Sequence, residues 1–266
     1  MSPEESVRAG NLSQALQDLQ QRVRGNPGDF KSRIFLYQLL AVLGQWERAA
    51  TQLKVASDLD PSTLILAQIG RQALQAEQLR ARVFAGGTTP LLMGEPEGWI
   101  ALLLEALRLS AEGHYEKAAE LRGQALEGAP TTPGTINGEK FEWIADADSR
   151  IGPCLEVIVD GKYFWVPFSK IKSLRMEPPA DLQDTVWLQT IVTWTNQGQV
   201  PALIPTRYVG SESGDDIVKL SRRTDWTAHP ADTYFGLGQR MFATDAGEYP
   251  LLEVREIVFN AEAAGG

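Results

Sequence analysis

The first half of the chain carries a repeat with a period of 34 residues. In each copy a glycine is followed two positions later by a large apolar residue and five positions later by an alanine. A proline stands seventeen positions after each glycine. The glycines are Gly10, Gly44 and Gly113, and the prolines are Pro27, Pro61 and Pro130. A 34-residue period of this kind is typical of tetratricopeptide repeats, in which each copy is a pair of helices.

The repeated residues have physical roles in a helix pair. The glycine allows the chain to turn between two helices, and the alanine is small enough for those helices to pack closely. The proline ends the second helix, because it has no N–H and disfavours helical geometry at the residue before it. We therefore predict a tetratricopeptide-like domain over residues 1–130, with at least six helices in antiparallel pairs and no sheet.

One copy of the repeat is degenerate. Its second helix would start near Leu79, but the sequence there lacks the glycine signature. We predict one longer helix over residues 62–84, an irregular loop to residue 96, and a new helix from residue 97 or 98 to residue 110.

Stacked helix pairs present a concave face formed by the first helix of each pair, and such faces bind partners. Tetratricopeptide geometry predicts a partner-binding face that alternates apolar and polar side chains. Its members are Lys31, Ile34, Gln38, Ile65, Gln68, Gln72, Ile100, Leu103 and Leu107. The alternative is that the apolar members pack on the next helix or on the second domain.

The second half changes to the two-residue period of β-strands. Asp160-Gly161 separates two apolar runs, 154–159 and 162–168, and this dipeptide is a strong hairpin signal because a type I′ turn needs positive φ twice. Further strands are predicted at 141–145, 185–195, 199–204, 240–244 and 251–259. Short strands joined by tight turns predict an antiparallel sandwich or partly open barrel over residues 131–266. The fold class is therefore α+β with two domains.

Composition excludes several kinds of partner. The formal net charge is −9, and both halves carry more acidic than basic residues. Neither half offers the basic field that nucleic acid or an anionic membrane attracts. With one cysteine, Cys154, an intramolecular disulfide is impossible. The polar N-terminus and the lack of a long apolar run predict a cytoplasmic protein without membrane insertion.

A dense set of polar residues in the second half has two interpretations. Its members are Arg207, Tyr208, Glu212, Arg223, Asp225, Trp226, Gln239 and Arg240. They could form a second binding surface, with an anion pocket built from Arg207 and Arg240. They could instead form a hydrogen-bonded network that fixes irregular loops to the sheet, since buried charges need partners.

No cluster of nucleophile, base or metal ligands is evident. Cys154 lies in an apolar strand pattern, and the two histidines, His114 and His229, are far from it in sequence. A zinc site needs four close nitrogen or sulfur ligands. The sequence therefore predicts no catalytic residues, no metal and no cofactor.

Motifs in the second half resemble those of the ImpE family, also called TagJ or SciE, of type VI secretion accessory proteins. They are Ile204-Pro-Thr-Arg-Tyr208, Gly210-Ser-Glu212, Arg223-Thr-Asp-Trp226, Gly236-Leu-Gly-Gln-Arg240 and Tyr249-Pro-Leu-Leu-Glu-Val-Arg255. The resemblance extends over essentially the whole chain.

The resemblance implies a cytoplasmic, non-enzymatic adaptor that binds the N-terminal helix of the small subunit of the contractile sheath. An amphipathic helix in an apolar groove is a common mode of recognition. The alternative function is a small-molecule or anion-binding enzyme or sensor that uses the arginine-rich loops. Oligomeric state and stoichiometry with the sheath stay open.

Overall fold

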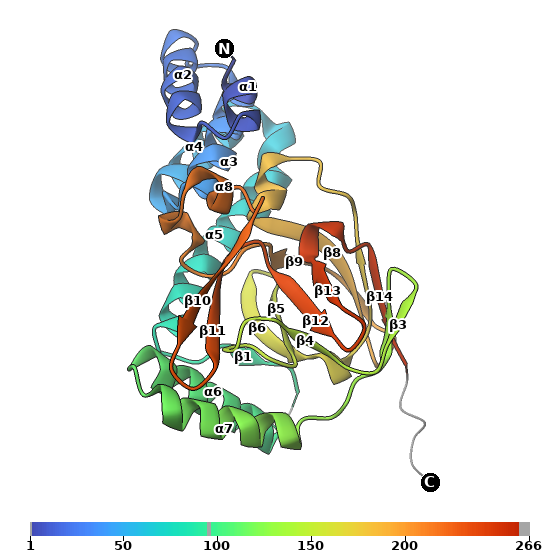
Figure 1. Cartoon of the computed structure of the whole chain (residues 1–266). Coiled ribbons are helices and arrows are strands. Elements are labelled where there is room, and N and C mark those ends of the chain that lie inside the picture. The colour runs from blue at the N-terminus through green and yellow to red at the C-terminus, as the bar shows by residue number, and fades with distance from the viewer. Residues whose placement is uncertain (1, 95–96, 261–266) are drawn as a thin grey trace.

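A computed structural model describes residues 2–94 and 97–260 (Figure 1). Helices from the first half of the chain run along one side, and sheets from the second half form the other side. The predicted α+β class is confirmed.

The helical part begins with seven α-helices among the described residues up to 130. They are α1 (Pro3–Arg8), α2 (Leu12–Gly25), α3 (Phe30–Val42), α4 (Trp46–Leu59), α5 (Leu64–Phe84), α6 (Gly98–Ala111) and α7 (Tyr115–Gly128). A short 3₁₀ turn, η1 (Pro61–Thr63), leads into α5. Each repeat glycine has the positive φ of a left-handed turn residue, between +69° and +83°. The long α5 confirms the prediction for the degenerate copy.

The prediction of no sheet before residue 130 is wrong at one place. The two-residue strand β1 (Leu91–Leu92) pairs in parallel with β6 (Lys162–Pro167), with Leu91 opposite Phe164. The loop between α5 and α6 runs along the edge of the sheet, so its backbone groups bond there. Local sequence does not reveal this pairing because the partner strand is about 70 residues away.

The strands of the second half, together with β1, form three sheets. A nine-stranded sheet has the order β1-β6-β5-β9-β8-β7-β14-β2-β3, a three-stranded sheet has the order β13-β12-β4, and β10 pairs with β11 alone. The large sheet ends at β1 and β3, so it is not a closed barrel. Strand bounds are β2 (Gly134–Ile136), β3 (Glu139–Phe141), β4 (Ile144–Asp146), β5 (Cys154–Val159), β7 (Ile171–Met176), β8 (Trp187–Trp194), β9 (Gln199–Pro205), β10 (Thr224–His229), β11 (Thr233–Gly238), β12 (Met241–Thr244), β13 (Glu248–Pro250) and β14 (Glu256–Phe259). Short helical elements between them are η2 (Phe168–Lys170), η3 (Leu182–Thr185), η4 (Ser211–Ser213), α8 (Asp216–Lys219) and η5 (Leu251–Glu253).

The hairpin of β5 and β6 is confirmed, and Asp160 and Gly161 both have positive φ, at 48° and 74°. Two other predicted strands are each interrupted where the chain passes from one sheet to another. The chain at 251–259 makes η5 and then β14, because after β13 it crosses from the three-stranded sheet to the large one. The segment 141–145 is split between β3 and β4 in the same way, with the exposed Trp143 at the crossing.

Two large hydrophobic cores hold the molecule together, and a small third one lies between α6 and α7. One lies between the large and the three-stranded sheets, where Phe168 meets Phe242 edge to face. The other joins the helical part to the opposite face of the large sheet, and includes Phe84 packed on Trp165. The helices and the sheet therefore share one core across the predicted boundary at residue 130.

Candidate functional site

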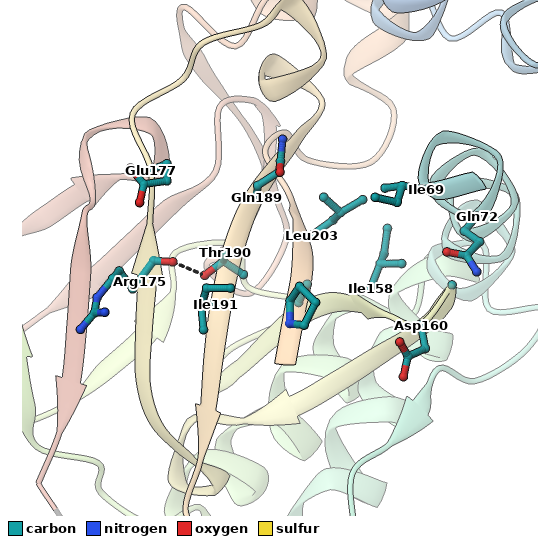
Figure 2. A pocket seen from close by; sticks show the side chains of 13 residues that line it. Ile69, Gln72, Ile158, Asp160, Arg175, Glu177, Gln189, Thr190, Ile191 and Leu203 are labelled. Carbon is teal, nitrogen blue, oxygen red and sulfur yellow. Dashed lines mark hydrogen bonds between the residues drawn. The ribbon is translucent and has the colours of Figure 1, made fainter. Parts of the chain in front are cut away.

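A groove lies where α5 passes over the outer face of the large sheet. Its volume is about 270 Å³, and Figure 2 shows Ile69 and Gln72 of α5 across from Ile158 and Leu203 of the sheet. Strands β7 and β8 continue the floor away from the helix, beyond the part of the sheet that α5 covers.

The groove is apolar because of how β8 alternates. Leu188 and Val192 are fully buried in the core between the sheets, whereas Ile191 between them points to the other face and is 42% exposed. On the helix, Ile69 is 44% exposed and faces the same space. Large apolar side chains left this exposed on both walls of one groove are characteristic of a binding surface.

Polar groups form the rim of the groove. Asp160 and Gln72 lie at the α5 end, and Arg175 and Glu177 lie at the β7 end (Figure 2). The Thr190 hydroxyl donates a 3.0 Å hydrogen bond to the Arg175 carbonyl, which fixes the floor between them. An apolar floor with charged ends suits a segment that has one apolar stripe and polar flanks.

The structure brings only part of the predicted partner-binding face to this groove. Gln72 lines it, and Gln68 and Ile65 lie about one and two turns earlier on α5, both exposed. Ile65 is the most exposed large apolar residue of the described chain, at 74%. Lys31 is exposed and Ile34 half-buried on α3, away from the residues that line the groove.

Four predicted members are not exposed, and the expectation of a continuous concave surface is wrong for them. Ile100, Leu103 and Leu107 of α6 and Gln38 of α3 are at most 7% exposed. Leu103 packs beside Gly152, because the chain before β5 covers this face of α6. The packing alternative therefore holds here.

Sequence reasoning missed the sheet wall of the groove. Ile69 follows Ile65 by one helical turn and belongs to the same face, so the helical period could have included it. The two-residue period of the predicted strand 185–195 puts Ile191 on the face opposite to Leu188 and Val192, but nothing in the sequence shows which strands leave a face uncovered.

Arg207 and Arg240 are both buried, which favours the network interpretation over an anion pocket built from these two arginines. Arg240 is fully buried and bonds Asp146, Glu156 and the Pro205 carbonyl. Arg80 of α5 bonds the same glutamate, with its Nε 2.7 Å from Glu156 Oε1. The two arginines thus share one carboxylate, which links the helical part to the sheet.

These charges shift the acid–base behaviour of the network. Burial alone would raise the pKa of Glu156, but Arg80 and Arg240 lower it to about 2. Burial raises the pKa of Asp146 to about 6, although the positive charge of Arg240 opposes this rise. The Tyr208 hydroxyl contacts the same Asp146, at 3.1 Å.

Arg207 has a different set of partners. Its guanidinium donates to the carbonyls of Ala41 and Val42 at the end of α3, and to that of Lys219 at the end of α8. Helix C-termini carry partial negative charge, so a cation there is stabilising. Burial lowers the pKa of Arg207 to about 10. The network interpretation therefore holds for this residue too.

Gln239 and Glu212 also hold loops in place. The Gln239 side chain donates to the Ser221 carbonyl at 2.7 Å and accepts from the Leu252 N–H at 2.9 Å. Glu212 lies directly against the repeat glycine Gly44.

Two members of the polar set remain at the surface. Arg223 is exposed and pairs with Asp215 and Asp225, each at 2.7 Å. Trp226 is 40% exposed and packs on Tyr208, with ring centroids 5.6 Å apart.

The possible nucleophile is fully buried, and the half-buried His229 packs against aromatic rings. Cys154 is fully buried, and burial raises the pKa of its thiol far above the usual range. His229 stacks on Tyr115 with ring centroids 4.7 Å apart, and the Phe235 ring is tilted against it at 4.3 Å. Within residues 2–94 and 97–260, no helix combines the length and apolarity needed to cross a membrane.

The fold and groove define an α+β protein in which helix pairs dock on a mostly antiparallel sheet. The family model described as ImpE protein matches residues 138–258. The type VI secretion system accessory component TagJ of Pseudomonas aeruginosa is 50% identical over 260 residues, which cover 97% of this chain and 91% of TagJ. The crystal structure of protein VPA1032 from Vibrio parahaemolyticus superposes with a TM-score of 0.89 at 28% identity, covering 98% of each chain.

The chain therefore belongs to the ImpE/TagJ family, as the motifs indicated. Membership supports an accessory role in type VI secretion.

Proposed function

We propose that this chain is a non-enzymatic cytoplasmic adaptor of a type VI secretion system, and that it binds the amphipathic N-terminal helix of the small sheath subunit. The groove between α5 and the sheet is the proposed site. The observation that carries the proposal is the exposure of Ile69 and Ile191 on facing walls of one apolar groove.

A helix is the guest that suits this groove. A helix satisfies its own backbone hydrogen bonds and offers an apolar stripe with polar flanks. Each large apolar side chain that it buries contributes about 1.5–3 kcal/mol before association costs. About four such side chains would contribute on the order of 6–10 kcal/mol before those costs, so the affinity depends on a preformed groove that keeps the costs low.

The rigidity of the surroundings supports a preformed groove. Gln72 packs against Gly161, where a Cβ would lie 2.7 Å from its side chain, so α5 is held against the β5–β6 turn. Arg80, two turns further along α5, is tied to Glu156 of β5. The helical wall and the sheet wall are therefore fixed to each other, and we propose that the parts predicted as domains 1–130 and 131–266 act as one unit.

The internal partners of the charged loops support a non-enzymatic role. Arg207 and Arg240 are occupied by protein groups, and Cys154 is buried beneath the sheet surface. An anion-binding or catalytic use of these residues would require breaking the bonds that hold the loops.

The test is calorimetry with a synthetic N-terminal helix of the small sheath subunit. We expect Ile69→Gln and Ile191→Gln each to weaken binding about ten-fold with little change in melting temperature. Leu59→Gln on α4 is the matched control, because Leu59 is also 44% exposed but does not line the groove. Unchanged affinity in both groove variants would place the partner elsewhere.

The variant Ile65→Gln distinguishes two placements of the guest. If Ile65→Gln weakens binding and Ile191→Gln does not, the partner lies along the exposed face of α5, with Gln68 and the α3 residues Lys31 and Ile34. If both weaken it, the guest spans from helix to sheet.

A further inference from the structure

The two-stranded ribbon of β10 and β11 has one covered edge and one open edge. On the outer edge of β11, Tyr234 exchanges hydrogen bonds with Ser149, and Gly236 N donates to Asp148 at 2.8 Å. Gly238 bonds the Tyr208 N–H through its carbonyl and the Ser211 hydroxyl through its N–H. Loops of the protein therefore occupy the β11 edge along its length.

The register fixes the direction of the backbone groups on β10. Tyr234, Gly236 and Gly238 stand opposite Ala228, Trp226 and Thr224, respectively. In an antiparallel pair, residues opposite each other point their N–H and C=O groups either both inward or both outward. Since the β11 members point outward to the loops, the three β10 members point outward on the other side.

The outward groups of β10 are open for bonding. Among residues 2–94 and 97–260, the main-chain groups of Thr224, Trp226 and Ala228 make no hydrogen bond to another element. Trp226 and Ala228 are exposed, and the three outward positions hold no proline, lysine or other charged residue. Proteins usually block an exposed edge strand with such residues, because it is a template for another strand.

The ribbon is also packed on both of its faces. Phe235 packs under the Arg150 guanidinium, 4.2 Å from its ring centroid, and against Tyr115 of α7. The Tyr208 ring fills the space where Gly236 lacks a side chain. A strand added to β10 would therefore meet a preformed edge and would not have to order it.

We propose that β10 is a second docking surface, which binds an extended peptide segment of a partner protein by strand addition. Electrostatic complementarity selects the occupant: N–H and C=O groups alternate along the edge at strand spacing, and only an extended backbone offers the matching sequence of acceptors and donors. Trp226 beside the edge favours an apolar side chain at the neighbouring peptide position. This surface is independent of the groove proposed above.

The experiment uses the full-length chain and an array of overlapping 12-residue peptides from the type VI secretion proteins of the same bacterium. We expect at least one peptide to bind and to slow amide exchange at Trp226 and Ala228, with Asp225 and Thr227 already protected by the ribbon. Ala228→Pro should weaken that peptide at least ten-fold, because it removes an outward N–H and leaves the bonds between β10 and β11 intact. Ala228→Val keeps the N–H and should bind like the parent.

Three results would overturn the proposal. One is that no array peptide depends on the Ala228 N–H. Another is that bound peptides leave the amides of Trp226 and Ala228 exchanging freely. This second measurement uses the parent chain, so it remains informative even if the proline variant unfolds. The third is a dimer in light scattering that Ala228→Pro dissociates, which would make a second copy the occupant. The groove variants Ile69→Gln and Ile191→Gln should not affect these peptides.

Discussion

Replacing Arg240 with alanine should be among the most destabilising single changes in the protein. The guanidinium is fully buried between Asp146 and Glu156, and the variant would leave both carboxylates with fewer partners. Breaking a buried ion pair by removing one member costs about 3–5 kcal/mol. For a chain of 266 residues, an unfolding entropy of about 2 cal/mol/K per residue converts 4 kcal/mol into a fall in melting temperature of about 7 °C.

The matched control is Arg223→Ala. Arg223 also bonds two carboxylates, Asp215 and Asp225, but its side chain is 44% exposed. Exposed pairs contribute about 0–1 kcal/mol, so this variant should melt within about 2 °C of the parent. Calorimetric or circular-dichroism melts of the three proteins at one pH provide the comparison. If Arg240→Ala melts no lower than Arg223→Ala, burial does not set the importance of these ion pairs and the reasoning fails.

Other variants test the contacts between the helical part and the sheet. Gly44→Ala should lower the free energy of unfolding in a denaturant melt by about 2–3 kcal/mol, because φ is +69° and the new Cβ would lie 2.6 Å from Glu212. Gly113→Ala should lower it by only about 1 kcal/mol, because φ is +83° but the space around the new Cβ is open. The pKa of Glu156 is about 2 when folded and about 4.5 when unfolded, so its contribution to stability is present above pH 4.5 and should be lost as the pH falls to 2. Urea melts at pH 7, 4 and 3 should show this loss in the parent and a smaller one in Glu156→Gln. Leu103→Asp, at a position 1% exposed, should unfold the protein, so a folded variant that loses only partner binding would contradict the burial of α6.

Local features of the fold could be predicted from the sequence. The repeat glycines and prolines predicted where helices turn and end, and the dipeptide at Asp160 predicted the β5–β6 hairpin, because these signals act within a few residues. The pairing of β1 with β6 and the crossing of β14 to the large sheet could not be predicted. They depend on which distant segment lies alongside, and no local period encodes that.

The candidate site, too, could be predicted from the sequence only in part. The face of α5 that includes Ile65 and Gln72 follows from helical periodicity. Its partner wall at Ile191 lies more than 100 residues later and is apparent only when the strand order is known. The burial of Leu103 shows the limit of the repeat analogy: a first-helix position lines a concave surface only if nothing else covers it.

Side chains from the second half of the chain form hydrogen bonds with backbone groups at the ends of the first helices. Arg222 donates to the carbonyls of Val7 and Arg8 at the end of α1, and Asp216 accepts from the N–H of Leu12 at the start of α2. Arg207 does the same for the end of α3. Helix ends need such partners because their last N–H and C=O groups have none within the helix.

In a longer repeat array, the next helix pair would cover the apolar faces, but here one continuous segment of the second half, residues 207–222, bonds one end of each of the first three helices. The motif-rich loops therefore fix the first two helix pairs to the sheet. The orientation of α5 over the sheet follows from the same contacts, since Arg80 also bonds the Arg207 carbonyl at 2.9 Å. The motif residues Arg207 and Arg240 thus help to hold α5 against the sheet, although neither lines the groove.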